Sequence, residues 1–152
     1  MRARKRLQAL SGALLLVSAL AAGCGGDGVF VSSESAGEGP PPQETMTLAT
    51  IQATIFTPRC AIAGGCHAGV DAPFGQDLSA GKAYTSIVGV ESQEVPGLLR
   101  VHPGDPDSSY LVMKVAGDPA IAGERMPFGG PYLEQSEIDA IREWIRAGAL
   151  DN

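Results

Sequence analysis

The stretch most informative about the fold is "RCAIAGGCHAG", Arg59 to Gly69, in which five residues separate two cysteines and a histidine follows the second cysteine directly. Two thiols at this spacing can form a disulfide, hold a metal ion or attach a cofactor covalently. His67 helps to choose between these three uses. If Cys66 is bonded to a cofactor, the adjacent histidine side chain lies at one face of that cofactor. The glycines before Cys66 tolerate the positive backbone φ angles that a bulged loop needs.

Covalent attachment of haem uses these residue types in this order. Two cysteine sulfurs form thioether bonds to the porphyrin vinyl groups, and the histidine after the second cysteine ligates the iron. The usual attachment motif has two residues between its cysteines, whereas this chain has five. We predict one covalent haem at Cys60 and Cys66 with His67 as an axial iron ligand. The longer spacing leaves open whether one sulfur or both are bonded.

A second axial ligand is expected in "GERMPFGGP", which contains Met126. The Gly and Pro residues predict an irregular loop here, so Met126 has no helix face on which to serve as an ordinary core residue. A thioether ligand to iron explains its position, and His/Met ligation suits electron transfer. The competing candidates are Met113, within the helical pattern "SSYLVMKV", and His102, in a polar turn.

Two short helices are expected in the first half of the folded region. In "TLATIQATIF" the apolar residues Leu48, Ile51 and Ile55 recur at helical spacing, and Pro58 should prevent the helix from continuing. In "DLSAGKAYTSIVGV" we expect Ser79 as the N-cap of a second helix, whose apolar stripe comprises Tyr84, Ile87 and Val88.

Two further helices are expected in the second half. In "VHPGDPDSSYLVMKVAG" we expect Asp105 as the N-cap, Pro106 at the first helical position and Gly117 as the terminator, with Leu111 and Val115 on one face. In "LEQSEIDAIREWIRAGAL" acidic residues come early and arginines late, as the helix dipole favours, and Gly148 follows as the stop. Its apolar face comprises Ile138, Ile141, Trp144 and Ile145.

The order of these features resembles that of class I-like c-type cytochrome domains, in particular those of small bacterial lipoproteins. The resemblance covers about residues 47–149, and its most specific parts are Cys66-His67, Met126-Pro127 and the last helix with Trp144. It implies an all-α, cytochrome c-like fold of about four short helices with long Gly/Pro loops around a covalent haem. It also implies that the first and last helices cross beside the haem, with Trp144 at its edge.

The N-terminal region predicts export and anchoring. Residues 1–23 have the basic start and apolar stretch of a secretory signal, and "LAAGC" resembles the lipobox that precedes a lipidated cysteine, here Cys24. Residues 24–45 are rich in Gly, Ser and Pro, as in a flexible linker, and lead into a domain at residues 46–152. We expect a lipid-anchored protein of the cell envelope, with the outer membrane favoured and the domain in the periplasm or at the cell surface. A plain secretory signal is the alternative.

Charge bears on the partners. Removal of residues 1–23 takes away four of the eleven basic residues and none of the seventeen acidic ones, which leaves a net charge of −10. This charge argues against nucleic acid as a partner and favours redox proteins with a basic docking patch. Since protein ligands would fill both axial positions of the iron, we expect an electron carrier and not an enzyme.

Other interpretations compete with this one. The first is a haem-free interaction or structural domain of the envelope with a Cys60–Cys66 disulfide. The second is zinc held by Cys60, Cys66, His67 and His102. The third is haem catalysis or ligand sensing, which requires Met126 to be off the iron. Three arginines are candidates to pair with haem carboxylates, although we expect each to be solvated at the surface: Arg59, Arg100 and Arg125.

Overall fold

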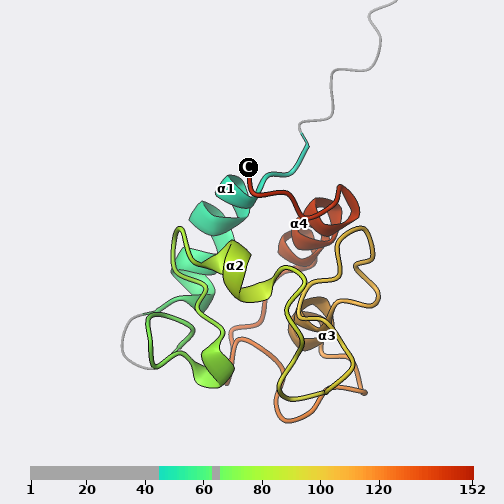
Figure 1. Ribbon diagram of the computed structural model, residues 1–152. Coiled ribbons are helices and arrows are strands. Elements are labelled where there is room, and N and C mark those ends of the chain that lie inside the picture. Colours follow the sequence, from blue (N-terminus) through green and yellow to red (C-terminus); the bar gives the residue numbers. More distant parts are fainter. Residues whose placement is uncertain (1–44, 63–65) are drawn as a thin grey trace, which may run out of the picture. The chain divides into compact units, whose positions relative to one another are not determined.

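The computed structural model describes residues 45–62 and 66–152, and its architecture is all-α (Figure 1). These residues form helices joined by long loops, and they contain three isolated β-bridges but no strand. The all-α prediction is therefore confirmed for the described residues. The predicted signal, the lipidated Cys24, nearly all of the linker and the glycine bulge at 63–65 lie outside them. No helix in the described ranges has the length and apolar character needed to cross a membrane.

The first helix runs straight into the cysteine segment. It begins as α1 (Leu48–Ile51), with the Thr47 side chain accepting a hydrogen bond from the Thr50 amide, and continues as the π-helix η1 (Gln52–Cys60). The prediction that Pro58 prevents continuation is wrong, because η1 passes through it. In the wider i→i+5 pattern the helix loses only the hydrogen bond that proline cannot donate. The apolar face is confirmed, since Leu48, Ile51 and Ile55 are buried.

The second helix, α2 (Ala83–Ile87), begins three residues later than predicted. Lys82, not Ser79, occupies its N-cap, and no side chain caps it. Gly81 explains the difference, because its φ of +75° is incompatible with a right-handed helix through that position. Ser79 instead belongs to the preceding turn, where its carbonyl accepts from the amides of Lys82 and Ala83.

The third helix, α3 (Tyr110–Ala116), also begins later than predicted, with Ser109 at its N-cap. Asp105 caps a separate turn, in which its Oδ1 accepts from the amides of Asp107 and Ser108. This turn satisfies the local donors before the helix begins, so the predicted start is wrong. The predicted end is confirmed, because Gly117 has the left-handed φ of +77° that ends a helix.

The last helix, α4 (Gln135–Arg146), agrees with its prediction. Glu134 is the N-cap, and it forms a capping box with Glu137 in which each side chain accepts from the other residue's backbone amide. Gly148, with a φ of +104°, follows the end of the helix. The four residues of the predicted apolar face are all buried: Ile138, Ile141, Trp144 and Ile145.

The core forms where α4 packs against α1 and α3. The C-terminus returns to the start of α1 (Figure 1), where the Leu48 amide donates to Asn152 Oδ1 at 3.0 Å and the Ala49 amide donates to the Asn152 carbonyl at 2.8 Å. These bonds satisfy amides that the first turn of a helix leaves free. The long loops between the helices contribute much of the lining of a cavity.

Candidate functional site

A cavity of about 610 Å³ brings together the four site residues predicted in the described part of the chain. Its walls include Cys60 at the end of η1, Cys66 and His67 just after it, and Met126 from the loop before α4. A volume of this size lies within the range of roughly 300–1,000 Å³ that is typical of ligand and cofactor pockets. His67 and Met126, which are 59 positions apart in the sequence, thus line the same cavity.

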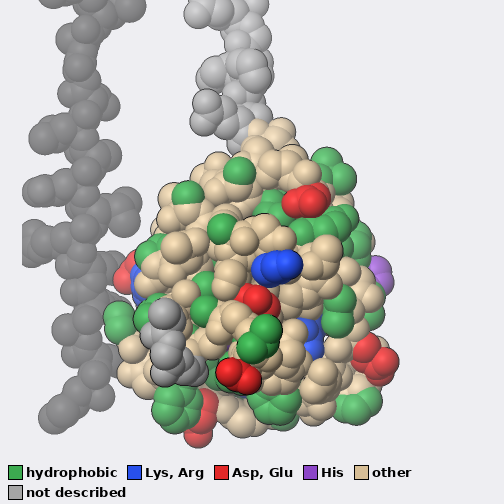
Figure 2. Space-filling model, turned by 60° about the vertical axis from the view of Figure 1, so that its left-hand side comes forward, with side chains coloured by type: hydrophobic (Ala, Val, Ile, Leu, Met, Phe, Trp, Pro, Cys, Tyr) green, Lys and Arg blue, Asp and Glu red, His purple; other side chains and the backbone are tan. Residues whose placement is uncertain are grey.

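The cavity reaches the surface through an apolar rim. Ile62, Phe74 and Phe128 line it and are also exposed, with Phe128 at 75%. Hydrophobic side chains also reach the surface at many places on the face in Figure 2, beside isolated acidic and basic groups. An apolar group bound in this cavity would therefore keep one edge near solvent.

The two cysteines lie at one wall of the cavity despite their spacing. The His67 amide donates to the Cys60 carbonyl at 2.9 Å, and this bond holds the backbone at Cys60 next to the backbone at His67. Both cysteines have free thiols in the structure.

Burial separates the two thiols chemically. Desolvation at its partly buried position raises the pKa of Cys60 from 9.0 to about 12, although the nearby Arg59 opposes the shift. Cys66 is exposed. The Cys60 thiol is thus protonated, and weakly nucleophilic, at neutral pH.

This difference predicts unequal alkylation of the reduced, haem-free protein. At pH 8, iodoacetamide should modify Cys66 at least tenfold faster than Cys60, since the raised pKa of Cys60 leaves little of it as thiolate and its burial limits access of the reagent. Peptide mapping by mass spectrometry measures the two rates separately. In denaturant the rates should converge, and similar rates in the native protein would contradict the burial of Cys60.

His67 is held in the form that ligates metals. Its Nδ1 lies 3.1 Å from the Gln76 carbonyl, and since a carbonyl only accepts, Nδ1 must be the protonated donor. Burial lowers the pKa of His67, partly opposed by this hydrogen bond, and so favours the neutral ring. The lone pair of Nε2 is therefore available to a metal ion. The Gln76 carbonyl also fixes the orientation of the ring, as the hydrogen-bond acceptors of metal-bound histidines commonly do.

Met126 is the cavity-lining member of the three candidates for the second ligand. Its amide donates to the Lys114 carbonyl at 3.0 Å, which ties the loop to α3. Met113 on α3 and the exposed His102 do not line the cavity. The zinc set is not assembled either, because His102 lies apart from the other three residues. Within residues 45–62 and 66–152 no three His, Cys, Asp or Glu side chains are grouped to hold a metal ion.

Arg100 differs most from its prediction. It lines the cavity but is only 4% exposed, not solvated at the surface, and its guanidinium donates to the carbonyls of Phe74, Gly75 and Ser86. Among the described residues no carboxylate lies within ion-pair distance of it. Burial lowers its pKa, as expected for a desolvated cation.

A second buried cationic side chain also lines the cavity. Lys114 on α3 is buried, and its Nζ lies 3.2 Å from Glu94 Oε2 and donates to the Ala122 carbonyl at 2.8 Å. The cavity is thus lined by apolar side chains together with buried cationic ones. Trp144, expected at the haem edge, does not line the cavity, and its Nε1 donates to the Leu150 carbonyl in the core.

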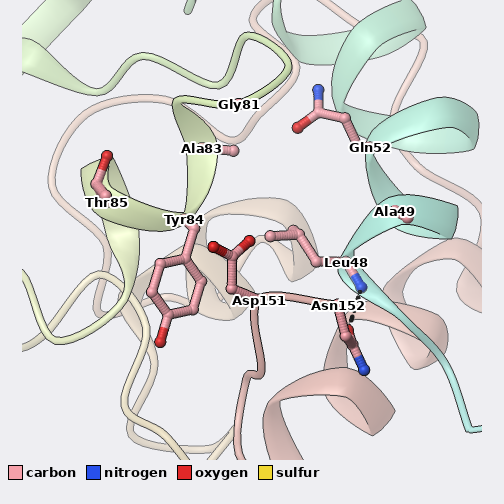
Figure 3. Close-up of a pocket in the computed structure, with 9 residues that line it drawn as sticks. All are labelled: Leu48, Ala49, Gln52, Gly81, Ala83, Tyr84, Thr85, Asp151 and Asn152. Atoms are coloured by element: carbon pink, nitrogen blue, oxygen red, sulfur yellow. Dashed lines mark hydrogen bonds between the residues drawn. The ribbon is translucent and has the colours of Figure 1, made fainter.

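A smaller pocket of about 200 Å³ lies between α1, α2 and the C-terminus (Figure 3). Its lining includes Gln52, Tyr84 and Asp151 but none of the predicted site residues. The bond from the Leu48 amide to Asn152 closes one side of it.

Comparison of the chain with known protein families, with curated proteins and with solved structures gave no match.

Proposed function

We propose that this protein is a one-electron carrier with a single covalent haem, in the manner of the class I-like c-type cytochromes that its sequence resembles. The observation that carries the proposal is the shared cavity of Cys60, Cys66, His67 and Met126. Two thiols, an imidazole with a free Nε2 and a thioether are the side chains that such a cofactor requires.

The cavity also suits haem in its distribution of polarity. Apolar residues such as Leu111 and Val115 on α3 would contact the porphyrin. Arg100 and Lys114 place cationic groups in the wall, where they would meet the two carboxylates of haem. Arg100 in particular is buried without a described carboxylate partner, and burial of an unpaired charge is costly. An anionic group in the cavity would supply the missing partner.

Each residue then has a defined role. Cys60 and Cys66 would hold the cofactor by thioether bonds, and His67 and Met126 would ligate its iron. When bound, haem supplies a couple between ferric and ferrous iron that exchanges one electron. The aliphatic walls exclude water from that region, and the thioether of Met126 favours a high reduction potential. With both His67 and Met126 bound to the iron, substrates would have no open site there.

The remaining expectations complete the proposal. Cleavage before Cys24 and its acylation would anchor the domain in the cell envelope, with the outer membrane favoured, and the linker would let it reach its partners. The partners would be redox proteins with a basic docking patch, since the mature chain is strongly acidic.

The test is covalent haem in the mature protein. We expect a pyridine haemochrome spectrum that survives acid-acetone extraction when the chain is expressed with haem-attachment machinery. Cys60→Ser and Cys66→Ser should each retain haem through one bond, with the α-band at longer wavelength because one vinyl group stays conjugated. The double variant should lose its haem on extraction.

Two results would overturn the proposal. A colourless protein with Cys60 and Cys66 oxidised to a disulfide would support the haem-free envelope domain. A haem-loaded protein that binds carbon monoxide readily in the ferrous state would support catalysis or ligand sensing, because Met126 would then not occupy the iron.

A further inference from the structure

We propose that Arg59 is a positioning residue for Met126. It fastens the loop of residues 125–132, here called the methionine loop, to the helix that bears Cys60. The inference rests on the proposed function for the role of Met126 as a ligand. The anchoring itself concerns the protein alone, and it can be measured with or without haem.

The contacts of Arg59 join three parts of the fold. Its Nη2 donates to the carbonyls of Pro131 and Tyr132, each at 3.0 Å, where the methionine loop ends. Its Nη1 donates to the carboxylate of Glu137 on α4, at 3.0 Å to Oε1 and 3.2 Å to Oε2. Arg59 precedes Cys60, so one side chain links the attachment segment, the methionine loop and α4.

The other end of the methionine loop is fastened to α3. The Met126 amide donates to the Lys114 carbonyl at 3.0 Å, and Arg125 Nε donates to the Val115 carbonyl at 2.9 Å. The Arg125 guanidinium also lies 4.3 Å from the centre of the Tyr132 ring. The segment between Met126 and Tyr132 thus has one end held on α3 and the other held by Arg59.

This arrangement explains why a loop rich in glycine and proline can present a ligand. Gly129 and Gly130 both have positive φ angles, so the loop owes little of its shape to regular structure. Removing Arg59 would release the end near Tyr132 and widen the range of positions open to Met126. Because Arg59 and Glu137 are partly exposed, with side-chain exposures of 27% and 21%, the ion pair itself should add little to global stability.

Arg59→Met is the sharper variant, and Arg142→Met is its matched control. Glu137 is less suitable, because its Oε2 also accepts from the Glu134 amide at 2.8 Å and its loss would uncap α4. Arg142 also pairs with an acidic residue, Asp107, but contacts neither the methionine loop nor the cysteine segment. Arg59→Lys keeps a cation for Glu137 but lacks the planar fork that reaches both carbonyls.

The first measurement is amide hydrogen exchange in the full-length protein, with or without bound haem. The probes are the amides of Met126 and Gly130, of which the second donates to the Pro127 carbonyl at 3.0 Å. Arg59→Met should speed their exchange at least tenfold, Arg59→Lys less, and Arg142→Met not at all. Unchanged exchange in Arg59→Met, with the fold intact by circular dichroism, overturns the inference.

The second measurement is ligation in the haem-loaded protein. Arg59→Met should weaken the thioether-to-ferric charge-transfer band and raise ferrous carbon monoxide affinity at least tenfold, while Arg142→Met leaves both unchanged. Faster exchange with unaltered ligation would overturn the positioning role. If the unmutated protein carries no haem, the proposed function fails, and the exchange measurement still decides whether Arg59 anchors the loop.

Discussion

Replacing Met126 by alanine should lower the reduction potential of the haem-loaded protein by on the order of 0.1–0.2 V, a fraction of the roughly 0.8 V that axial ligation spans. The thioether stabilises ferrous over ferric iron, so its loss favours the oxidised state. We expect this effect from Met126 because this residue lines the cavity together with His67. Potentiometric titration of the purified protein measures the shift.

Met113→Ala is the matched control for this prediction. Met113 is also a methionine but lies on α3 outside the cavity lining, so its truncation should leave the potential and the charge-transfer band unchanged. An unshifted reduction potential in Met126→Ala, or an equal shift in Met113→Ala, would contradict the proposal that Met126 is a ligand of the iron.

Truncation of Trp144 to alanine should destabilise the fold by about 3–5 kcal/mol, the usual cost of deleting a large buried aromatic side chain. Trp144 is 1% exposed and belongs to the core cluster with residues of α1, α3 and α4. Its Nε1 also donates to the Leu150 carbonyl at 2.8 Å. Denaturant-induced unfolding of the mature protein, followed by circular dichroism, measures the free-energy change.

Trp144→Phe separates packing from hydrogen bonding. It keeps an aromatic ring and loses the donor, so we expect a smaller loss of about 1–3 kcal/mol from the unsatisfied acceptor and the reduced volume. A cost below about 1 kcal/mol for the alanine variant would contradict the central position of Trp144 in the core.

The sequence predicted the parts of the fold that depend on local chemistry. In α4, the apolar spacing, the acidic start and Gly148 all favour the same helix, and the structure has it at Gln135–Arg146. Gly117 likewise ends α3 because few other residues adopt its φ. The starts of α2 and α3 were mispredicted, because Ser79 and Asp105 serve turns that offer the same hydrogen bonds as a helix cap.

The sequence predicted which residues belong to the candidate site, but it did not predict which other side chains surround them. Chemical type and unusual context marked His67 and Met126, and the structure places both at one cavity. Arg100 was a candidate by chemical type, but its burial could not be predicted, because a surface arginine and a buried arginine have the same side chain. What distinguishes Arg100 is the convergence of the carbonyls of Phe74, Gly75 and Ser86, which only the folded backbone creates.

Because η1 is a π-helix, it should tolerate the deletion of a residue better than an α-helix does. Each i→i+5 turn encloses one residue more than an α-turn, so losing one residue between 52 and 57 can be absorbed by tightening the helix, and Cys60 would keep its orientation. The same loss within α4 would rotate every later side chain by about 100° and carry Trp144 out of the core. Length variation in this domain should therefore be accommodated ahead of Cys60 and excluded from the last helix.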